Sequence, residues 1–238
     1  VYFGGSEKNG VVSSGGGQAV FGTTSNVALD GGNQSVLSGG VASGTFVDLG
    51  ATQFVFSKGS ASGTVVNNGG TQAVHSGGSA SFTTVSRGGN QYLVFSGTAI
   101  STTLKTGGSE YVYSAATASG TMVSTGATQY VSKGGSAVST TVSSGGTEFV
   151  HSGGSAISTT VNFSGNESVL SGGSASGTTV SSGGFEYVYS GGTTTGTLVS
   201  IGGKQIVSSG GVTTGSVVSN GGIEVVSFGG TADFTTVS

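Results

Sequence analysis

The sequence contains no cysteine, no proline and no tryptophan, and only 6% of its 238 residues are charged. Without cysteine, neither disulfides nor thiolate metal sites can stabilise the fold. Six basic against nine acidic residues give a net charge of −3, which excludes the basic surface that nucleic-acid binding requires. No apolar run approaches membrane-spanning length, so we expect no membrane contact within these residues.

Glycine is abundant, with 50 residues, yet the composition does not indicate a flexible linker or a disordered region. Disordered regions combine high net charge with few apolar residues, and this chain has little charge. Valines also recur at regular positions, which a flexible Gly/Ser linker does not require. The composition therefore favours an ordered structure stabilised by stacking.

The sequence repeats every 19 residues, and eleven units follow one another without a gap from Leu29 to Val237. Each unit resembles S-S-G-G-T-Q-x-V-x-S-G-G-S-A-x-G-T-x-V, and residues 143–161 are a clear example. Position 8 is Val except at Leu93, and position 19 is Val except at Leu104. A fixed period of this length predicts a solenoid in which each unit stacks on its neighbours.

The repeat also predicts the domain organisation. Residues 1–28 are irregular N-terminal coils, and within them residues 13–28 form a unit that lacks three residues. Residues 29–238 contain the eleven regular repeats. We expect one continuous domain. Because no capping segment is visible after the last repeat, we also expect the chain to be a fragment of a longer array.

Gly-Gly pairs at positions 3–4 and 11–12 predict two turns in each unit. Between them we expect two short strands rich in Val, Thr and aromatic residues, such as residues 147–151 and 157–161. If 19 residues form one coil, the strands of successive units pair in parallel. Val at positions 8 and 19 and Ala at position 14 then line the interior.

Position 6 is always Gln or Glu and lies, by strand alternation, on the same side as the valine at position 8. Its full burial is costly unless it is hydrogen-bonded. A ladder of amides along the solenoid satisfies Gln, but stacked carboxylates repel each other. We therefore expect position 6 at a half-wet corner, accepting backbone N–H bonds, with the Thr at position 17 bonded to a turn. The position 6 residues are Gln34, Gln53, Gln72, Gln91, Glu110, Gln129, Glu148, Glu167, Glu186, Gln205 and Glu224.

The pattern S-S-G-G-x-[QE]-x-V-x-S-G-G-x-A-x-x-T-x-V resembles the passenger repeats of AIDA-type self-associating autotransporter adhesins over essentially the whole chain. This resemblance implies an all-β fold, a right-handed parallel β-helix (β-solenoid) of 19-residue coils. It implies display on the surface of a Gram-negative bacterium through a C-terminal outer-membrane barrel that lies outside this chain. The implied activities are adhesion, autoaggregation and biofilm formation. The implied partners are a host cell-surface receptor or glycan and identical passengers.

The resemblance also implies O-linked heptose, added to passenger serines by a cytoplasmic heptosyltransferase. Position 10 precedes the second Gly-Gly turn, where we expect an exposed hydroxyl. Serines at positions 1, 2 and 13, such as Ser143, Ser144 and Ser155, are alternatives, and all these serines could instead cap the local backbone. The candidate acceptors at position 10 are Ser38, Ser57, Ser76, Ser114, Ser152, Ser171, Ser190 and Ser209.

Aromatic residues at positions 7 and 9 face outward by alternation. Such a row can form an adhesive surface for sugars or for another solenoid, or it can simply stabilise the sheet by cross-strand stacking. We favour stacking, and the two roles are compatible. The residues of this possible adhesive face are Phe54, Phe56, Tyr92, Tyr111, Tyr113, Tyr130, Phe149, Tyr187 and Tyr189.

The sequence favours a binding protein rather than an enzyme. His75 and His151 are four coils apart and cannot share a metal, and no Ser, His and Asp fall together as a triad. We therefore expect no metal, no cofactor and no enzymatic activity. Two alternatives remain: a structural stalk that presents another adhesive domain, and, less favoured, a polysaccharide-degrading β-helix using Glu148, Glu167 and Glu186.

Overall fold

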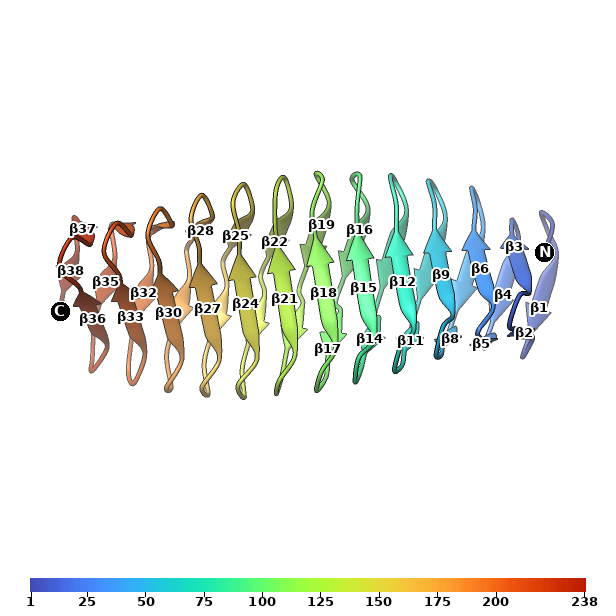
Figure 1. Cartoon of the computed structure of the whole chain (residues 1–238), viewed down its shortest axis with the longest axis horizontal. Helices are drawn as coiled ribbons and strands as arrows, with labels where there is room; N and C mark the ends of the chain where they lie inside the picture. The colour runs from blue at the N-terminus through green and yellow to red at the C-terminus, as the bar shows by residue number, and fades with distance from the viewer. The chain divides into compact units, whose positions relative to one another are not determined.

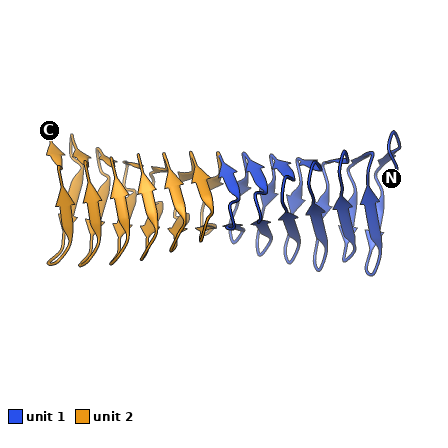
Figure 2. Cartoon of the chain, turned by 90° about the horizontal axis from the view of Figure 1, so that it is seen from above, with its two compact units in different colours: residues 1–119 blue, residues 120–238 orange.

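A computed structural model describes all residues from 1 to 238. The chain is all-β, with strands β1 to β38 and no helix. It divides into two compact units, Val1–Ser119 (unit 1) and Gly120–Ser238 (unit 2), which are described separately and coloured separately in Figure 2. Each unit is a parallel β-solenoid built from three sheets, here named A, B and C.

In unit 1 the strands of each sheet follow one another at every third position in the chain. Sheet A contains β1 (Ser6–Lys8), β4 (Thr23–Ser25), β7 (Val41–Ser43), β10 (Ser60–Ser62), β13 (Ser79–Ser81), β16 (Thr98–Ile100) and β19 (Thr117–Ser119). Sheet B contains β2 (Val11–Ser13), β5 (Ala28–Asp30), β8 (Phe46–Val47), β11 (Val65–Val66), β14 (Thr84–Val85) and β17 (Thr103–Leu104). Sheet C contains β3 (Gly17–Val20), β6 (Asn33–Val36), β9 (Thr52–Val55), β12 (Thr71–Val74), β15 (Asn90–Leu93) and β18 (Ser109–Val112).

Unit 2 follows the same order. Its sheet A contains β22 (Ser136–Val138), β25 (Ser155–Ile157), β28 (Ser174–Ser176), β31 (Thr193–Thr195), β34 (Val212–Thr214) and β37 (Thr231–Asp233). Its sheet B contains β20 (Met122–Val123), β23 (Thr141–Val142), β26 (Thr160–Val161), β29 (Thr179–Val180), β32 (Leu198–Val199), β35 (Val217–Val218) and β38 (Thr236–Val237). Its sheet C contains β21 (Thr128–Val131), β24 (Thr147–Val150), β27 (Asn166–Val169), β30 (Phe185–Val188), β33 (Lys204–Val207) and β36 (Ile223–Val226).

Paired strands run parallel, and their partners are one repeat apart. Gln53 pairs with Gln72 in sheet C, and Ala156 pairs with Ala175 in sheet A. Within each unit, Figure 1 shows the sheet C strands lying side by side in the same direction. One coil for each 19-residue unit is therefore confirmed. Near the N-terminus, Gln18 pairs with Gln34, 16 residues later, so the shortened unit keeps its position 6 in register.

Each coil contains three strands, and the prediction of two strands is wrong. The second expected strand, residues 157–161, is divided by Ser158, whose φ of 58° places it in the left-handed region. Position 16 is the third corner of every coil and is often glycine, as at Gly177 with φ 66°. Because a positive φ lies outside the extended β region, a strand cannot continue through this corner, and glycine adopts it at the least cost.

The valine and alanine columns form the core, as predicted. Position 8 is buried with no exposed surface from Val36 to Val207, and position 19 is equally buried from Val47 to Val199. The alanines at position 14, such as Ala156, complete the apolar lining. Each buried valine contributes about 1.5–3 kcal/mol of hydrophobic stabilisation, so every coil adds a similar increment.

Position 6 is fully buried from Gln34 to Gln205, so the expected half-wet corner is wrong for these coils; Glu224, in the last coil, is half-buried. In unit 1 the Gln side chains form a ladder along the axis: Gln72 Nε2 donates to Gln53 Oε1 at 2.7 Å, and Gln91 Nε2 donates to Gln72 Oε1 at 2.7 Å. The Thr at position 17 bonds this ladder rather than a turn, since Thr83 Oγ1 donates to Gln72 Oε1 at 3.1 Å. These bonds offset the cost of burying the amides.

Candidate functional surface

The position 10 serines lie at the turn that leads from sheet C to sheet A in each coil. Ser114 is half-buried, and the other seven candidates are exposed. No hydrogen bond within the chain involves their hydroxyl groups. The capping role that competes with modification is therefore absent here. The candidates lie in unit 1 (Ser38, Ser57, Ser76, Ser114) and in unit 2 (Ser152, Ser171, Ser190, Ser209).

A glycine in the following coil leaves free space beside most of these hydroxyls. A Cβ added at Gly172 would lie 2.7 Å from Ser152 Oγ, and one added at Gly191 would lie 2.7 Å from Ser171 Oγ. Ser57 has the same relation to Gly77, at 3.0 Å. Glycine at position 11 thus keeps a side chain away from the hydroxyl of the preceding coil.

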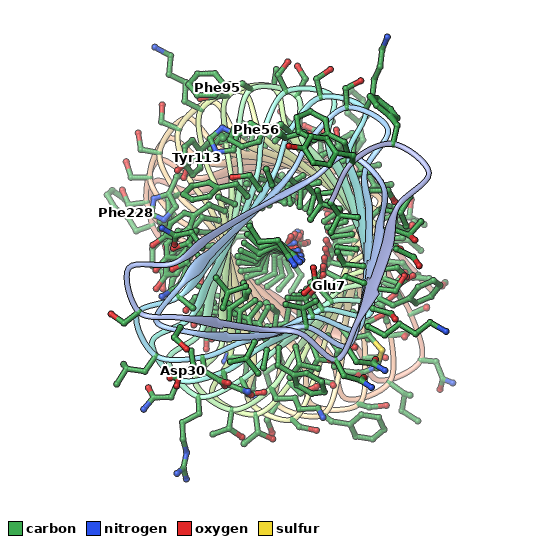
Figure 3. All side chains as sticks on the ribbon, turned by 90° about the vertical axis from the view of Figure 1, so that its right-hand side faces the viewer. Glu7, Asp30, Phe56, Phe95, Tyr113 and Phe228 are labelled. Carbon is green, nitrogen blue, oxygen red and sulfur yellow. The ribbon has the colours of Figure 1, made fainter.

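Three coils carry another residue at position 10: Phe95, Lys133 and Phe228. All three side chains are exposed, and Phe95 retains 62% of its surface despite a φ of 49°. In Figure 3, Phe95 projects outward from the ribbon, whereas Glu7 points into the interior. The column of serines at this turn is therefore interrupted by large side chains.

The aromatic residues of unit 1 stack on the outer face of sheet C and remain half-exposed. The Phe54 and Phe56 rings are 5.9 Å apart, and His75 stacks on Phe56 at 5.1 Å. Tyr92 and Tyr111 stack at 4.8 Å. Figure 3 shows Phe56 and Tyr113 directed away from the interior. Cross-strand stacking and outward exposure thus occur together.

Partial burial in this stack, and then the neighbouring Tyr111 and Tyr113 phenols, raise the pKa of Tyr92. Tyr92 therefore stays protonated at neutral pH and adds no charge to the face. An uncharged aromatic surface suits stacking on an apolar ring or a sugar face.

Unit 2 repeats this arrangement in two groups. Tyr130 stacks on Phe149 at 5.6 Å, and Tyr187 lies between Phe185 and Tyr189 at 5.9 and 6.1 Å. Tyr189 is 40% exposed. Between the groups, position 7 is Ser168, which is only 5% exposed although it lies on the outer face. Its partners in the adjacent strands are the larger Phe149 and Tyr187.

Sequence reasoning missed three members of these stacks. Phe185 lies at position 5, which alternation places on the same face as positions 7 and 9. His75 and His151 are too far apart to share a metal, and each packs instead against aromatic rings. Lys204 Nζ also lies 5.8 Å from the centre of the Phe185 ring. Alternation alone could have identified Phe185.

No group of three or more ligating side chains is placed to hold a metal. Glu148, Glu167 and Glu186, the residues proposed for polysaccharide cleavage, have no exposed surface. A polysaccharide cannot contact them in the folded solenoid, so the enzymatic alternative loses its catalytic residues. The structure also contains no helix long and apolar enough to cross a membrane.

Comparison with known proteins supports the resemblance found in the repeats. A family model described as "Adhesin of bacterial autotransporter system, probable stalk" (AIDA) matches residues 22–70, 57–108 and 91–146. The chain is also similar to the crystal structure of a TibC-catalyzed, hyper-glycosylated TibA fragment. The sequence identity is 36%, the TM-score is 0.77, and the similarity covers 98% of this chain and 99% of that one. None of the curated proteins compared with the chain matches it. The similarity in sequence and fold thus extends over both units.

Proposed function

The chain belongs to the family of adhesins of the bacterial autotransporter system, and from this premise we propose that it promotes adhesion and autoaggregation while carrying O-linked heptose. It is an autotransporter passenger, a class displayed at the bacterial surface. In this proposal a C-terminal outer-membrane barrel outside these residues anchors it. Its partners are a host receptor or glycan and identical passengers.

The exposed serines at position 10 are the observation that carries the glycosylation proposal. They repeat at one turn, and their hydroxyls are free of hydrogen bonds. Glycine at position 11 of the following coil leaves room beside five of them, Ser57, Ser152, Ser171, Ser190 and Ser209. The similar TibA fragment is hyper-glycosylated by TibC. A cytoplasmic heptosyltransferase that modifies these serines before export would cover this edge of the solenoid with sugar.

Intact-mass measurement tests the glycosylation proposal. When the chain is produced with a heptosyltransferase, we expect mass increments of one heptose residue per modified site. In unit 2 we expect most increments to disappear when the position 10 serines are replaced with alanine, because all four are exposed at the same turn. These serines are Ser152, Ser171, Ser190 and Ser209.

The matched control replaces serines at position 13, Ser136, Ser155 and Ser174, which lie on sheet A. If this control removes the increments and the position 10 variant keeps them, the assignment to position 10 is wrong. A mass equal to that of the bare polypeptide, in the presence of an active transferase, contradicts glycosylation altogether.

The aromatic stacks on sheet C are the second proposed contact surface, since they expose flat, uncharged rings on the outside. A stalk that presents another adhesive domain is the alternative, and the description "probable stalk" favours it. Aggregation of cells that display the passenger with and without residues 29–237 distinguishes the two. A stalk predicts that a spacer of similar length restores adhesion.

A further inference from the structure

Three consecutive coils of unit 2 place a glutamate at position 6. Glu148, Glu167 and Glu186 are direct partners in the adjacent strands β24, β27 and β30. Each has no exposed surface. Adjacent parallel strands lie about 4.8 Å apart, so three carboxyl groups follow one another in the closed interior.

An ionised carboxylate cannot replace glutamine as a donor in the axial ladder. An amide both donates and accepts, whereas an ionised carboxylate only accepts. Both oxygens of Glu167 are buried without a hydrogen-bond partner, and so is the Thr178 hydroxyl. The two neighbouring glutamates do accept a hydrogen bond from the Thr at position 17. Thr159 donates to Glu148 at 3.0 Å, and Thr197 donates to Glu186 at 3.3 Å. The middle carboxyl is therefore the one of the three with no hydrogen bond at either oxygen.

No cation faces this column from any strand packed around it. The elements that enclose it contribute only apolar side chains and hydroxyl groups. Along the column, Gln129 precedes Glu148 and Gln205 follows Glu186, and Gln205 Nε2 donates to Glu186 at 2.6 Å. Lys133 and Lys204 are exposed outside. The enclosing residues are Val150, Val169, Val188, Ala156, Ala175, Thr194, Val161, Val180, Val199, Thr159, Thr178 and Thr197.

Burial without a counter-charge favours the protonated acid. Desolvation raises the pKa of Glu186 to about 7 from an ordinary value of 4.5. Desolvation, and then the charges of Glu148 and Glu186, raise the pKa of Glu167 well above 4.5. A protonated carboxyl can donate its O–H to the next carboxyl and restore the missing axial bond.

We propose that Glu148, Glu167 and Glu186 form a proton-binding column that makes coils 143–199 open and close with pH. With protons bound, each acid donates to its neighbour and these coils stay closed. When the column releases protons to solvent, buried carboxylates repel one another and these coils open locally. This inference goes beyond adhesion and concerns how firmly one section of the passenger is folded.

The direction of the pH dependence follows from the raised pKa values. Below pH 4.5 the acids are protonated whether the coils are open or closed, and stability is greatest. As pH rises from 4.5 towards 7, the open coils lose protons first, so stability falls; above the pKa of the folded state the loss is complete. For Glu186 alone, a shift from 4.5 to about 7 corresponds to about a 300-fold rise in the opening equilibrium.

Amide hydrogen exchange of the whole chain at pH 5 and pH 8, corrected for the intrinsic rate, tests the proposal. Peptides covering β24, β27 and β30 should lose protection by about 100-fold or more at pH 8. Peptides covering β9, β12 and β15, which are lined by Gln53, Gln72 and Gln91, should not. Equal changes in the two sections would overturn the proposal.

The matched variant replaces all three glutamates with glutamine, which rebuilds the amide ladder of unit 1. Its coils 143–199 should show no excess pH dependence. Glu167→Gln alone should reduce the effect, and Glu224→Gln, in a half-buried position of the same unit, should leave it unchanged. Persistence of the wild-type pH dependence in the triple variant would refute the role of the column.

Discussion

Replacing Gln72 with leucine is expected to destabilise unit 1 by about 2–6 kcal/mol, because two buried groups lose their partner at about 1–3 kcal/mol each. Gln91 Nε2 and Thr83 Oγ1 both donate to Gln72 Oε1, and leucine offers no acceptor. Gln53 Oε1 also loses one of its two donors but keeps Thr64. Urea unfolding followed by circular dichroism measures the loss.

The control for this variant is Thr84→Val. Thr84 lies on sheet B, outside the core, and Val65 occupies the same position in the preceding coil. Its effect should stay within about 0.5 kcal/mol. If Gln72→Leu lowered the free energy of unfolding as little as this control does, the amide ladder would not offset the cost of burying the position 6 side chains.

Replacing Val150 with aspartate is expected to cost more than about 4 kcal/mol, because it places an unpaired charge in the apolar lining. Val150 has no exposed surface and stacks between Val131 and Val169. In a solenoid each coil supports its neighbours, so the damage should spread to adjacent coils. Hydrogen exchange should show protection lost around β24 rather than at distant strands.

A carboxylate placed on the outside of the same coil separates the effect of burial on stability from the effect of added charge. Ser155→Asp places a carboxylate on half-exposed sheet A of the same coil. We expect an effect within about 0.5 kcal/mol. A similar loss in both variants would show that added charge, not burial, controls the stability of this coil.

The sequence was sufficient for the coil length, the register and the apolar columns. A strict period forces equivalent residues into equivalent places, so Val150 and Val169 could be aligned without coordinates. The outward direction of Phe54 and Tyr92 followed from alternation in the same way. The similar TibA fragment and the family description agree with the adhesin class inferred from the pattern.

Two features were predicted wrongly for physical reasons. The sequence does not reveal the corner at position 16, because Ser158 and Phe82 adopt a positive φ where other coils have glycine. The glutamates at position 6 predict a wet corner, because stacked carboxylates repel each other in a buried ladder. Glutamine offsets the cost of its burial through hydrogen bonds along the axis. Coils 143–199 differ from the rest of the column because their three adjacent glutamates lack the amide donors that form these bonds.

The position 10 serines could be chosen from the sequence because they precede the second Gly-Gly turn of each unit. The structure adds that seven of the eight are exposed and that no hydrogen bond within the chain involves their hydroxyl groups.

The register of one coil per repeat is tested most directly by the distance between spin labels at residues 155 and 174. The chain has no native cysteine, so Ser155→Cys and Ser174→Cys can be labelled selectively. Their Cα atoms are direct partners in β25 and β28, about 4.8 Å apart. We predict strong dipolar broadening in the doubly labelled chain. A spectrum equal to the sum of the two singly labelled chains would contradict the solenoid.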